Sequence, residues 1–311
     1  MAHFNRNVRV FDGRTGTEAA GCWQYGRITV ATFYQWIHAS IVGPDSMRLF
    51  RCASIHDLNR RGIPLDPNSS DVLEIGTYVL LNEGGSFITM GHVIDMPLRR
   101  EYSYNDTCTP RSTDFTTRVR DRDGRCCFTG REVLGNNFTG FEAAHILPMG
   151  QTDDWNRRNL QRFVTDPLAP ANDKMNSIQQ GFLCLSTEHK LFDDYQIGVN
   201  PDDEYRITDF GGSNPNITLD GRQFYVADVE EHFRPSHALL RDHYRQCVLA
   251  CIKAVTGPAH LRRFDPNIDL GRGGFNLEEG GWWSGREGKE QLEVELAARL
   301  HRAIVSRDRT G

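Results

Sequence analysis

Lysine is scarce in this sequence: only four of the 36 basic residues are lysines, and the rest are arginines. Long apolar runs are also missing. The opening MAHFNRNVRVFDG lacks the apolar segment of a signal peptide, and no stretch approaches the length of a membrane span. We therefore expect a protein of the nucleus or cytoplasm without a membrane segment. The arginine excess suits phosphate recognition, although genomic base composition produces the same skew.

Cysteine is sparse as well, with eight in 311 residues and none in a C-x-x-C pair. This excludes a disulfide scaffold. Cys126 and Cys127 are adjacent, which suits neither a zinc knuckle nor a disulfide. We expect reduced thiols, mostly in the core, and no structural zinc. The net charge of −5 provides no global positive field for nucleic acid.

The patterning predicts an α+β fold in three parts. Residues 1–105 are β-rich, since short β-branched or aromatic runs alternate there with turn signals. These runs are RNVRVFDG, GRITVATFY, VLEIGTYVLL and SFITMGHVI. Between them, TFYQWIHASIVG has apolar residues at helical spacing and ends at Gly43-Pro44, which predicts one helix. We identify no chemistry in this first part.

The second part, residues 106–212, begins with a basic amphipathic helix. Phe115 and Val119 lie on one helical face, and Asp123-Gly124 provides the turn that ends it. Such a charged face is commonly just solvated, but it also suits contacts with phosphates beside an active site. The candidate nucleic-acid contacts in and after this helix are Arg118, Arg125 and Arg131.

The third part, residues 213–311, contains two predicted helices, PSHALLRDHYRQCVLACIKAVTGP with Ser236 as N-cap and GKEQLEVELAARLHRAIVS. The glycine-rich connection between them matches neither a dinucleotide fingerprint nor a P-loop, which excludes those nucleotide sites. We expect the two helices to cover a sheet or to form a homodimer surface.

An ionisable ring, His145, stands inside the apolar strand FEAAHILP. Taken alone, His145 is interpreted as a core histidine whose ring forms one hydrogen bond with the backbone. A polar loop of about 30 residues follows, then the strand GFLCLS, a short helix STEHKLFDDY with Ser186 or Thr187 as N-cap, and a hairpin around NPDD.

His189 and Asp193 are four residues apart on the short helix and therefore project from one face. A histidine and a carboxylate at this spacing bind a divalent cation if a third group arrives from elsewhere. Surface helices also carry such pairs without any metal.

The segments RDGRCCFTG, FEAAHILPM and GFLCLSTEHKLFDDYQIGVNPDDEYRITDF, in this order, resemble the HNH nuclease domain, in the branch common in filamentous-fungal proteins. The flanking NRNVRVFD, GCWQYGRITVATFY, LLRDHYRQCVLACI and KEQLEVELAARL resemble the flanking regions of those proteins. The resemblance therefore covers nearly the whole chain.

The resemblance implies a ββα-metal fold, in which two strands and a helix hold one Mg²⁺ or Mn²⁺ against the scissile phosphate of DNA or RNA. It assigns His145 as the general base and His189 as a metal ligand, to which the helical spacing adds Asp193 as a second candidate ligand. Gln180 takes the place of the asparagine of the family name and counts as a catalytic position.

Two residues depart from the family pattern. Ala144 stands where many HNH nucleases carry a metal-binding aspartate, although this branch tends to carry alanine there. Gln180 keeps the amide but adds a methylene, which moves its oxygen by about 1.5 Å. In addition, residues 110–210 hold 12 basic against 16 acidic residues, a net charge of −4.

Three functions are compatible with these features. The first is a metal-dependent endonuclease. The second is an HNH-fold binding module that has lost cleavage, favoured by Ala144, Gln180 and the acidic balance. The third is the same scaffold used for chemistry on a small metabolite, where His145 and His189 would do acid–base work.

Overall fold

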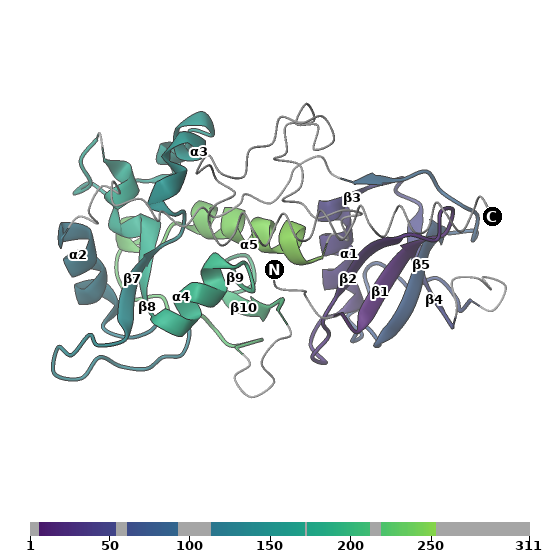
Figure 1. Ribbon diagram of the computed structural model, residues 1–311, viewed down its shortest axis with the longest axis horizontal. Helices are drawn as coiled ribbons and strands as arrows, with labels where there is room; N and C mark the ends of the chain where they lie inside the picture. The colour runs from purple at the N-terminus through teal and green to yellow at the C-terminus, as the bar shows by residue number, and fades with distance from the viewer. Residues whose placement is uncertain (1–5, 54–60, 93–112, 172, 212–218, 253–311) are drawn as a thin grey trace, which may run out of the picture. The chain divides into compact units, whose positions relative to one another are not determined.

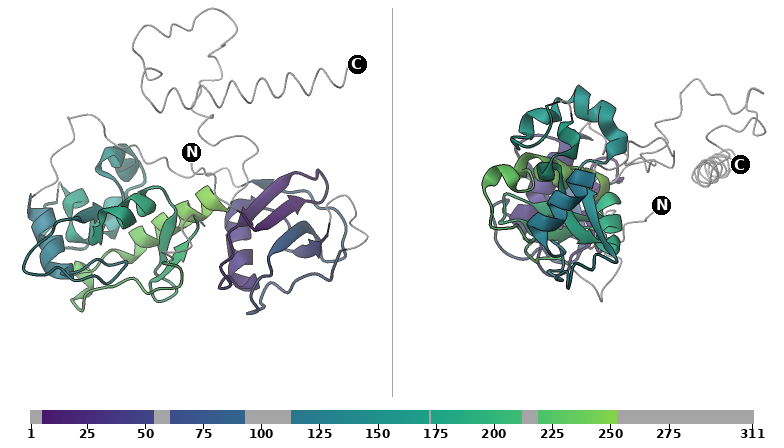
Figure 2. Two further views of the ribbon diagram at one scale, coloured as in Figure 1. Left: turned by 60° about the horizontal axis from the view of Figure 1, so that its bottom comes forward. Right: turned by 90° about the vertical axis from the view of Figure 1, so that its left-hand side faces the viewer.

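A four-stranded sheet forms the N-terminal part of the protein (Figure 1). The computed structural model describes residues 6–53, 61–92, 113–171, 173–211 and 219–252. The strand order is β2-β1-β5-β4. β1 (Val8–Asp12) pairs in parallel with β5 (Gly76–Asn82), whereas β2 (Glu18–Cys22) and β4 (Met47–Cys52) pair antiparallel with their neighbours. The α+β class and the β-rich beginning of the chain are confirmed, and the left view of Figure 2 shows these strands from a second side.

The helix α1 (Val30–Ser40) packs on this sheet through a buried face that includes Phe33 and Ile37. The prediction that GRITVATFY forms a strand is wrong, because its second half is the first turn of α1. Thr29 causes the switch, since its hydroxyl accepts a hydrogen bond from the Thr32 N–H and caps the helix. SFITMGHVI contributes only the two-residue strand β6 (Gly91–His92), paired with β3 (Ile41–Val42), and its end lies outside the described residues.

A β-hairpin forms the centre of the second part. β7 (Phe141–His145) pairs antiparallel with β8 (Gly181–Leu185), with His145 opposite Gly181. On one face lies α2 (Thr113–Asp123), whose Phe115 and Val119 are fully buried, as predicted. On the other lies α4 (Ser186–Asp193), which directly follows β8.

The beginning of α4 differs from the prediction. Leu185 is the N-cap, and neither Ser186 nor Thr187 caps the helix. The Ser186 hydroxyl instead donates to the Gly140 carbonyl, at the start of the hairpin. The predicted loop between β7 and β8 contains the short helix α3 (Thr152–Arg157) and several 3₁₀ turns.

The last described helix, α5 (His237–Cys251), contributes to two hydrophobic cores. Leu239 and Leu240 pack with the hairpin, whereas Cys247 and Val248 pack with the N-terminal sheet and α1. Ser236 is the N-cap residue as predicted, but its hydroxyl donates to the Phe163 carbonyl. Beside α5, β9 (Ile197–Asn200) and β10 (Arg206–Asp209) form the predicted hairpin.

The second C-terminal helix lies outside the described residues, and the homodimer surface expected on the C-terminal helices stays a prediction. Seven of the eight cysteines are described, and all seven are buried free thiols. Burial raises the pKa of Cys127, Cys184 and Cys251 well above the usual thiol range, which keeps them protonated. Within the described chain, we find no helix with the length and apolarity needed to cross a membrane.

A buried ion pair at the end of α2 fixes the outer edge of β8. The Arg122 guanidinium binds the Asp123 carboxylate, and both side chains are at most 2% exposed. Arg122 also donates to the Gly181 carbonyl at 2.8 Å, and the Leu183 N–H donates to Asp123 at 2.8 Å. The pair therefore forms hydrogen bonds with the edge of β8 that a third strand would otherwise form.

We expect Asp123→Asn to lower the free energy of unfolding by about 3–5 kcal/mol, because Arg122 would be left as a buried charge without its carboxylate. Urea denaturation measures the change. Glu132→Gln is the matched control, since it breaks the exposed pair with Arg125 and should cost less than about 1 kcal/mol. Equal losses in the two variants would contradict a special role for the buried pair.

Candidate metal and catalytic site

A row of a carboxylate, a histidine and a second carboxylate lies where α4 packs on the hairpin. Its members are Glu142 of β7 and His189 and Asp193 of α4. His189 and Asp193 are one turn apart, with His189 Nε2 3.4 Å from an Asp193 carboxylate oxygen. The other ring nitrogen, Nδ1, is 2.5 Å from the Glu142 carboxylate. Glu142 reaches the helix because side chains alternate along β7 and its own points to the α4 face.

Glu142 is a site residue that the sequence interpretation missed. Its signal was the period of two along β7, which places residues 142 and 144 on the same face. A metal-binding histidine commonly bonds its second nitrogen to a carboxylate, which fixes the tautomer and orients the ring. Glu142 stands in this position toward His189 and leaves Nε2 facing Asp193.

The donor set suits a hard divalent cation only in part. Nε2 of His189 and the Asp193 carboxylate are two adjacent donors, whereas Ala144, on the same face, has no side-chain donor to add. In the described residues, no three His, Cys, Asp or Glu side chains are grouped as a metal site. Mg²⁺ commonly takes few protein ligands and fills its shell with water and substrate phosphate, so two donors suit substrate-assisted binding.

His145 lies on the opposite face of the hairpin. Its ring stacks on Phe115 of α2, with centroids 4.0 Å apart and planes within 10°, and the residue is 5% exposed. Because side chains alternate along β7, His145 points away from the face that carries Glu142. The structure thus brings His189 and Asp193 together and places His145 beyond the strand from them.

The absence of a side chain at Gly181 allows the Phe115 ring to pack closely on the hairpin. A Cβ at Gly181 would lie 2.4 Å from the Phe115 ring and 2.6 Å from the Ala144 carbonyl oxygen. Only glycine therefore fits opposite His145 while the ring of Phe115 covers both residues.

Gln180 is fully buried and its amide continues the strand ladder beyond His145. The side-chain Nε2 donates to the Leu147 carbonyl at 2.8 Å, and Oε1 accepts from the Leu147 N–H at 3.2 Å. Its own backbone carbonyl accepts from the Ile146 N–H at 2.7 Å. These bonds hold the backbone directly after His145, so in this structure Gln180 positions the strand end.

Residues 126–200 match a family model described as HNH endonuclease. The match supports an HNH nuclease domain in this part of the chain and includes β7, β8 and α4. Searches of curated proteins and of solved structures found no match. The match spans about a quarter of the sequence, so the likeness of the flanking regions to filamentous-fungal proteins stays a prediction.

The three arginines predicted to contact nucleic acid have different surroundings. Arg118, before the HNH segment, donates to both oxygens of the buried Asp166 carboxylate at 2.9 Å. Burial would raise the pKa of Asp166, but hydrogen bonds from Arg118, the Leu168 N–H and Ser177 outweigh it and lower that pKa. Arg118 thereby ties α2 to the loop between β7 and β8.

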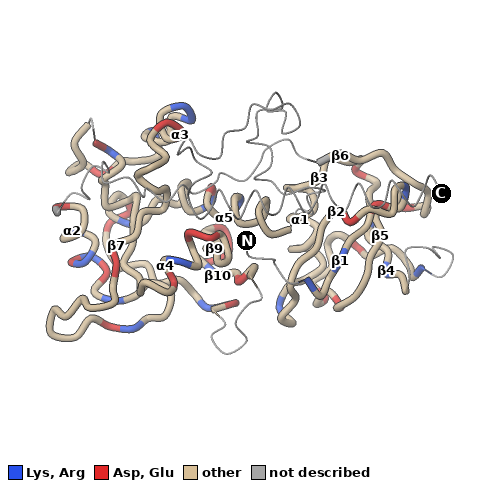
Figure 3. The backbone as a smooth tube through the Cα atoms, viewed as in Figure 1, with Lys and Arg blue, Asp and Glu red and all other residues tan. Residues whose placement is uncertain are grey.

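Arg125, directly before the segment that matches the HNH family, and Arg131, within it, lie at the surface. Arg125 forms an exposed ion pair with Glu132 and lies 4.7 Å above the Tyr225 ring. Arg131 is exposed, with its guanidinium 5.8 Å from the Phe141 ring centroid. Arg125 and Arg131 are therefore more accessible to phosphate than Arg118. Along α2 itself, basic and acidic residues are interspersed rather than grouped by the sign of their charge (Figure 3).

Glu188, next to His189 on α4, is a buried carboxyl at 4% exposure. Its Oε2 atom is buried without a hydrogen-bond partner in the described part of the chain. Burial raises the pKa of Glu188 above its ordinary value of 4.5, an effect reduced by a bond from its own backbone N–H. Helical geometry turns Glu188 toward the core, about 100° from His189.

We expect Gln180→Leu to lower the free energy of unfolding by about 1–3 kcal/mol, because the buried backbone groups of Leu147 would lose their partners. Urea denaturation measures the loss, and hydrogen exchange should show faster exchange of the Leu147 amide. Gln35→Leu is the control, since that glutamine is exposed on α1 and its replacement should change stability by less than about 0.5 kcal/mol. Unchanged exchange at Leu147 would contradict the positioning role.

We expect Glu188→Gln to be more stable than the wild type at pH 7 and to lose this advantage below pH 4.5. A carboxyl whose pKa is raised on folding stabilises the fold while protonated, and this contribution is lost as the pH rises through 4.5 to the raised pKa. Urea denaturation at pH 4 and 7 measures the effect, with the exposed Glu132→Gln as control. A constant difference between the two pH values would show that ionisation of Glu188 is not its cause.

Proposed function

We propose that the protein is a metal-dependent HNH-type endonuclease that hydrolyses phosphodiester bonds in DNA or RNA. The observation that carries the proposal is the row Glu142–His189–Asp193 on α4 and β7, inside the segment that matches the HNH endonuclease family. His189 and Asp193 are the proposed ligands of one Mg²⁺ or Mn²⁺. A location in the nucleus or cytoplasm is part of the same proposal.

The chain's own residues divide the work by position. The Glu142 carboxylate keeps the His189 ring oriented, so that Nε2 and the Asp193 carboxylate hold the metal from one side. A bound divalent cation would neutralise charge that develops on the phosphate and stabilise the leaving oxygen. Arg125 and Arg131 are the proposed contacts with flanking phosphates, whereas Arg118 would act through Asp166.

His145 is the proposed general base, which accepts a proton from the attacking water. Imidazole suits this step, since its ordinary pKa is near neutrality. The Phe115 ring and the Gln180 amide hold it in place. Because the residue is 5% exposed and points away from α4, the water must reach it at the end of β7, beside the loop that follows.

An HNH-fold binding module without cleavage is the second candidate. Two observations favour it: Ala144 adds no donor on the α4 face, and His145 is stacked in the core on Phe115. No contact of the described residues favours chemistry on a small metabolite.

We expect the purified protein to nick supercoiled plasmid, or to cut single-stranded RNA, with Mg²⁺ or Mn²⁺ but not with EDTA. His189→Ala should lose Mn²⁺ binding, measured by electron paramagnetic resonance, together with activity. His145→Ala should keep Mn²⁺ binding and lose about 10²- to 10⁴-fold in rate, the usual contribution of a general base. His232→Ala, which replaces a half-buried histidine paired with Glu230, is the control and should retain both.

Two outcomes would redirect the proposal. Nucleic-acid binding without cleavage by the wild type would identify the binding module. Cleavage that persists in both His145→Ala and His189→Ala would overturn the assigned site.

A further inference from the structure

A surface hollow of about 400 Å³ lies between the start of the segment that matches the HNH family and the strands that follow it, and it shares no residue with the row Glu142–His189–Asp193. Its lining combines two tyrosine rings, a guanidinium and an amide. The residues concerned are Arg125, Gly130, Tyr205, Gln223, Phe224, Tyr225 and Val226. This volume lies within the range of small-ligand sites in proteins.

Tyr205 is held in the hollow by an unusual backbone. Glu204 and Tyr205 both adopt left-handed conformations, with φ of 48° and 57°. A bulky aromatic residue rarely occupies this region, and such conformations gather at functional sites. The turn is supported by hydrogen bonds from the Phe224 N–H to the Tyr205 carbonyl at 2.9 Å and from Gln223 Nε2 to the Glu204 carbonyl.

A second ring and a cation form another side of the hollow. The Arg125 guanidinium lies 4.7 Å above the centroid of Tyr225. It also pairs with Glu132 at 3.0 Å, where the two side chains are 36% and 61% exposed. An exposed ion pair contributes little net free energy, so a phosphate oxygen can replace this carboxylate at small cost. Glu132 thus marks an anion position at the edge of the hollow.

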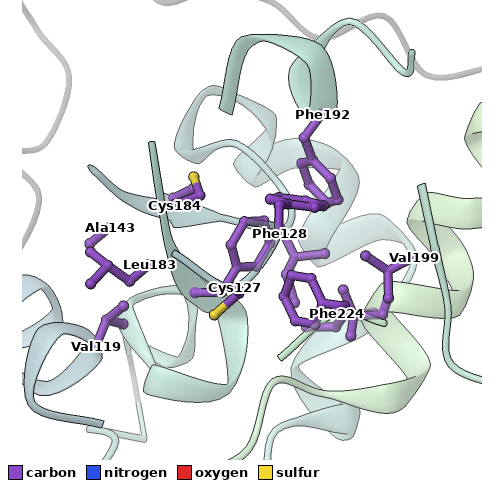
Figure 4. Packing of buried hydrophobic residues seen from close by; sticks show 14 of the residues in the cluster. Val119, Cys127, Phe128, Ala143, Leu183, Cys184, Phe192, Val199 and Phe224 are labelled. Atoms are coloured by element: carbon purple, nitrogen blue, oxygen red, sulfur yellow. The ribbon is translucent and has the colours of Figure 1, made fainter. Parts of the chain in front are cut away.

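The floor of the hollow is rigid. Phe224 is 2% exposed and contacts Phe128 edge-to-face, with centroids 5.1 Å apart. Phe128 in turn contacts Phe192 of α4 at 5.9 Å (Figure 4). The hollow is therefore built on the same aromatic cluster as the helix that carries His189.

We propose that this hollow binds one unpaired nucleotide of the nucleic acid, with the base stacked on the Tyr205 ring and the phosphate on Arg125, which lies over the Tyr225 ring. A nucleotide combines the flat aromatic surface and the anion that these side chains complement, and the Gln223 amide suits a base edge. A base within a duplex exposes no face for stacking, so the ligand is single-stranded. The inference rests on the proposed function, because it names the form of substrate that this protein would hold.

The test measures binding of fluorescein-labelled 12-nucleotide DNA and RNA by fluorescence anisotropy, in EDTA so that no cleavage occurs. The full chain should bind either single strand more tightly than a duplex of the same sequence. Tyr205→Asn, which removes the ring but keeps a residue that adopts the left-handed conformation, should weaken single-strand binding by roughly 5- to 100-fold, the range for loss of one stacked base. Arg125→Gln should weaken it as well and reduce its salt dependence.

Glu132→Gln keeps the inference falsifiable even if Tyr205→Asn does not fold. It removes the competing carboxylate and should tighten single-strand binding. Glu74→Gln is the matched control, because Glu74 forms another exposed pair, with Arg51 of the N-terminal sheet, and its loss changes the net charge equally. Equal effects of the two variants, or no effect of Glu132→Gln and Arg125→Gln, would overturn the proposed hollow.

Failure of this inference and failure of the proposed function are distinguishable. If the hollow variants bind like wild type while His189→Ala abolishes cleavage, the nuclease stands and the hollow is not its nucleotide site. If the hollow variants change binding but the wild type never cleaves, the nucleotide site stands on a binding module.

Discussion

The buried pair of Arg122 and Asp123 is the interaction on which the HNH part of the structure depends. A two-stranded hairpin leaves the outer backbone groups of β8 without a partner strand. Arg122, Asp123 and the Cys127 N–H satisfy the groups of Gly181 and Leu183 on this edge. Because the pair lies at the end of α2, it joins that helix, the hairpin edge and the segment that starts the family match into one unit.

This arrangement places the proposed metal ligands and the proposed general base on opposite faces of the hairpin. The alternation along β7 sends Glu142 to α4 and His145 to α2, where Phe115 covers it. The proposed metal ligands and the proposed base therefore approach each other only around the end of the strand, which Gln180 holds through Leu147. Cleavage requires that the attacking water reaches His145 at that end of the strand. This requirement distinguishes the endonuclease from the binding module, the two candidate functions.

The N-terminal sheet is not packed only on itself. α5 contributes residues to both hydrophobic cores, and Trp36 of α1 donates from its indole nitrogen to the Tyr244 hydroxyl at 3.2 Å. Tyr25 likewise donates to the Asp209 carboxylate of β10 at 3.1 Å. A part of the chain in which we identify no chemistry thus contacts α5 and β10, which follow the segment that matches the HNH family.

Local patterns in the sequence determined the α+β class, the apolar face of α2, the strands β7 and β8, and the one-face spacing of His189 and Asp193. Each depends on residues a few positions apart. The predicted beginnings of α1 and α4 differ from the observed N-caps, Thr29 and Leu185, because the N-cap position depends on backbone geometry that hydrophobic periodicity does not contain. Only the tertiary structure decided that Glu142 meets His189, that His145 stacks on Phe115 and that Gln180 binds Leu147. These contacts join residues separated by about 30 to 50 positions, and strand register and helix packing, rather than local spacing, bring them together.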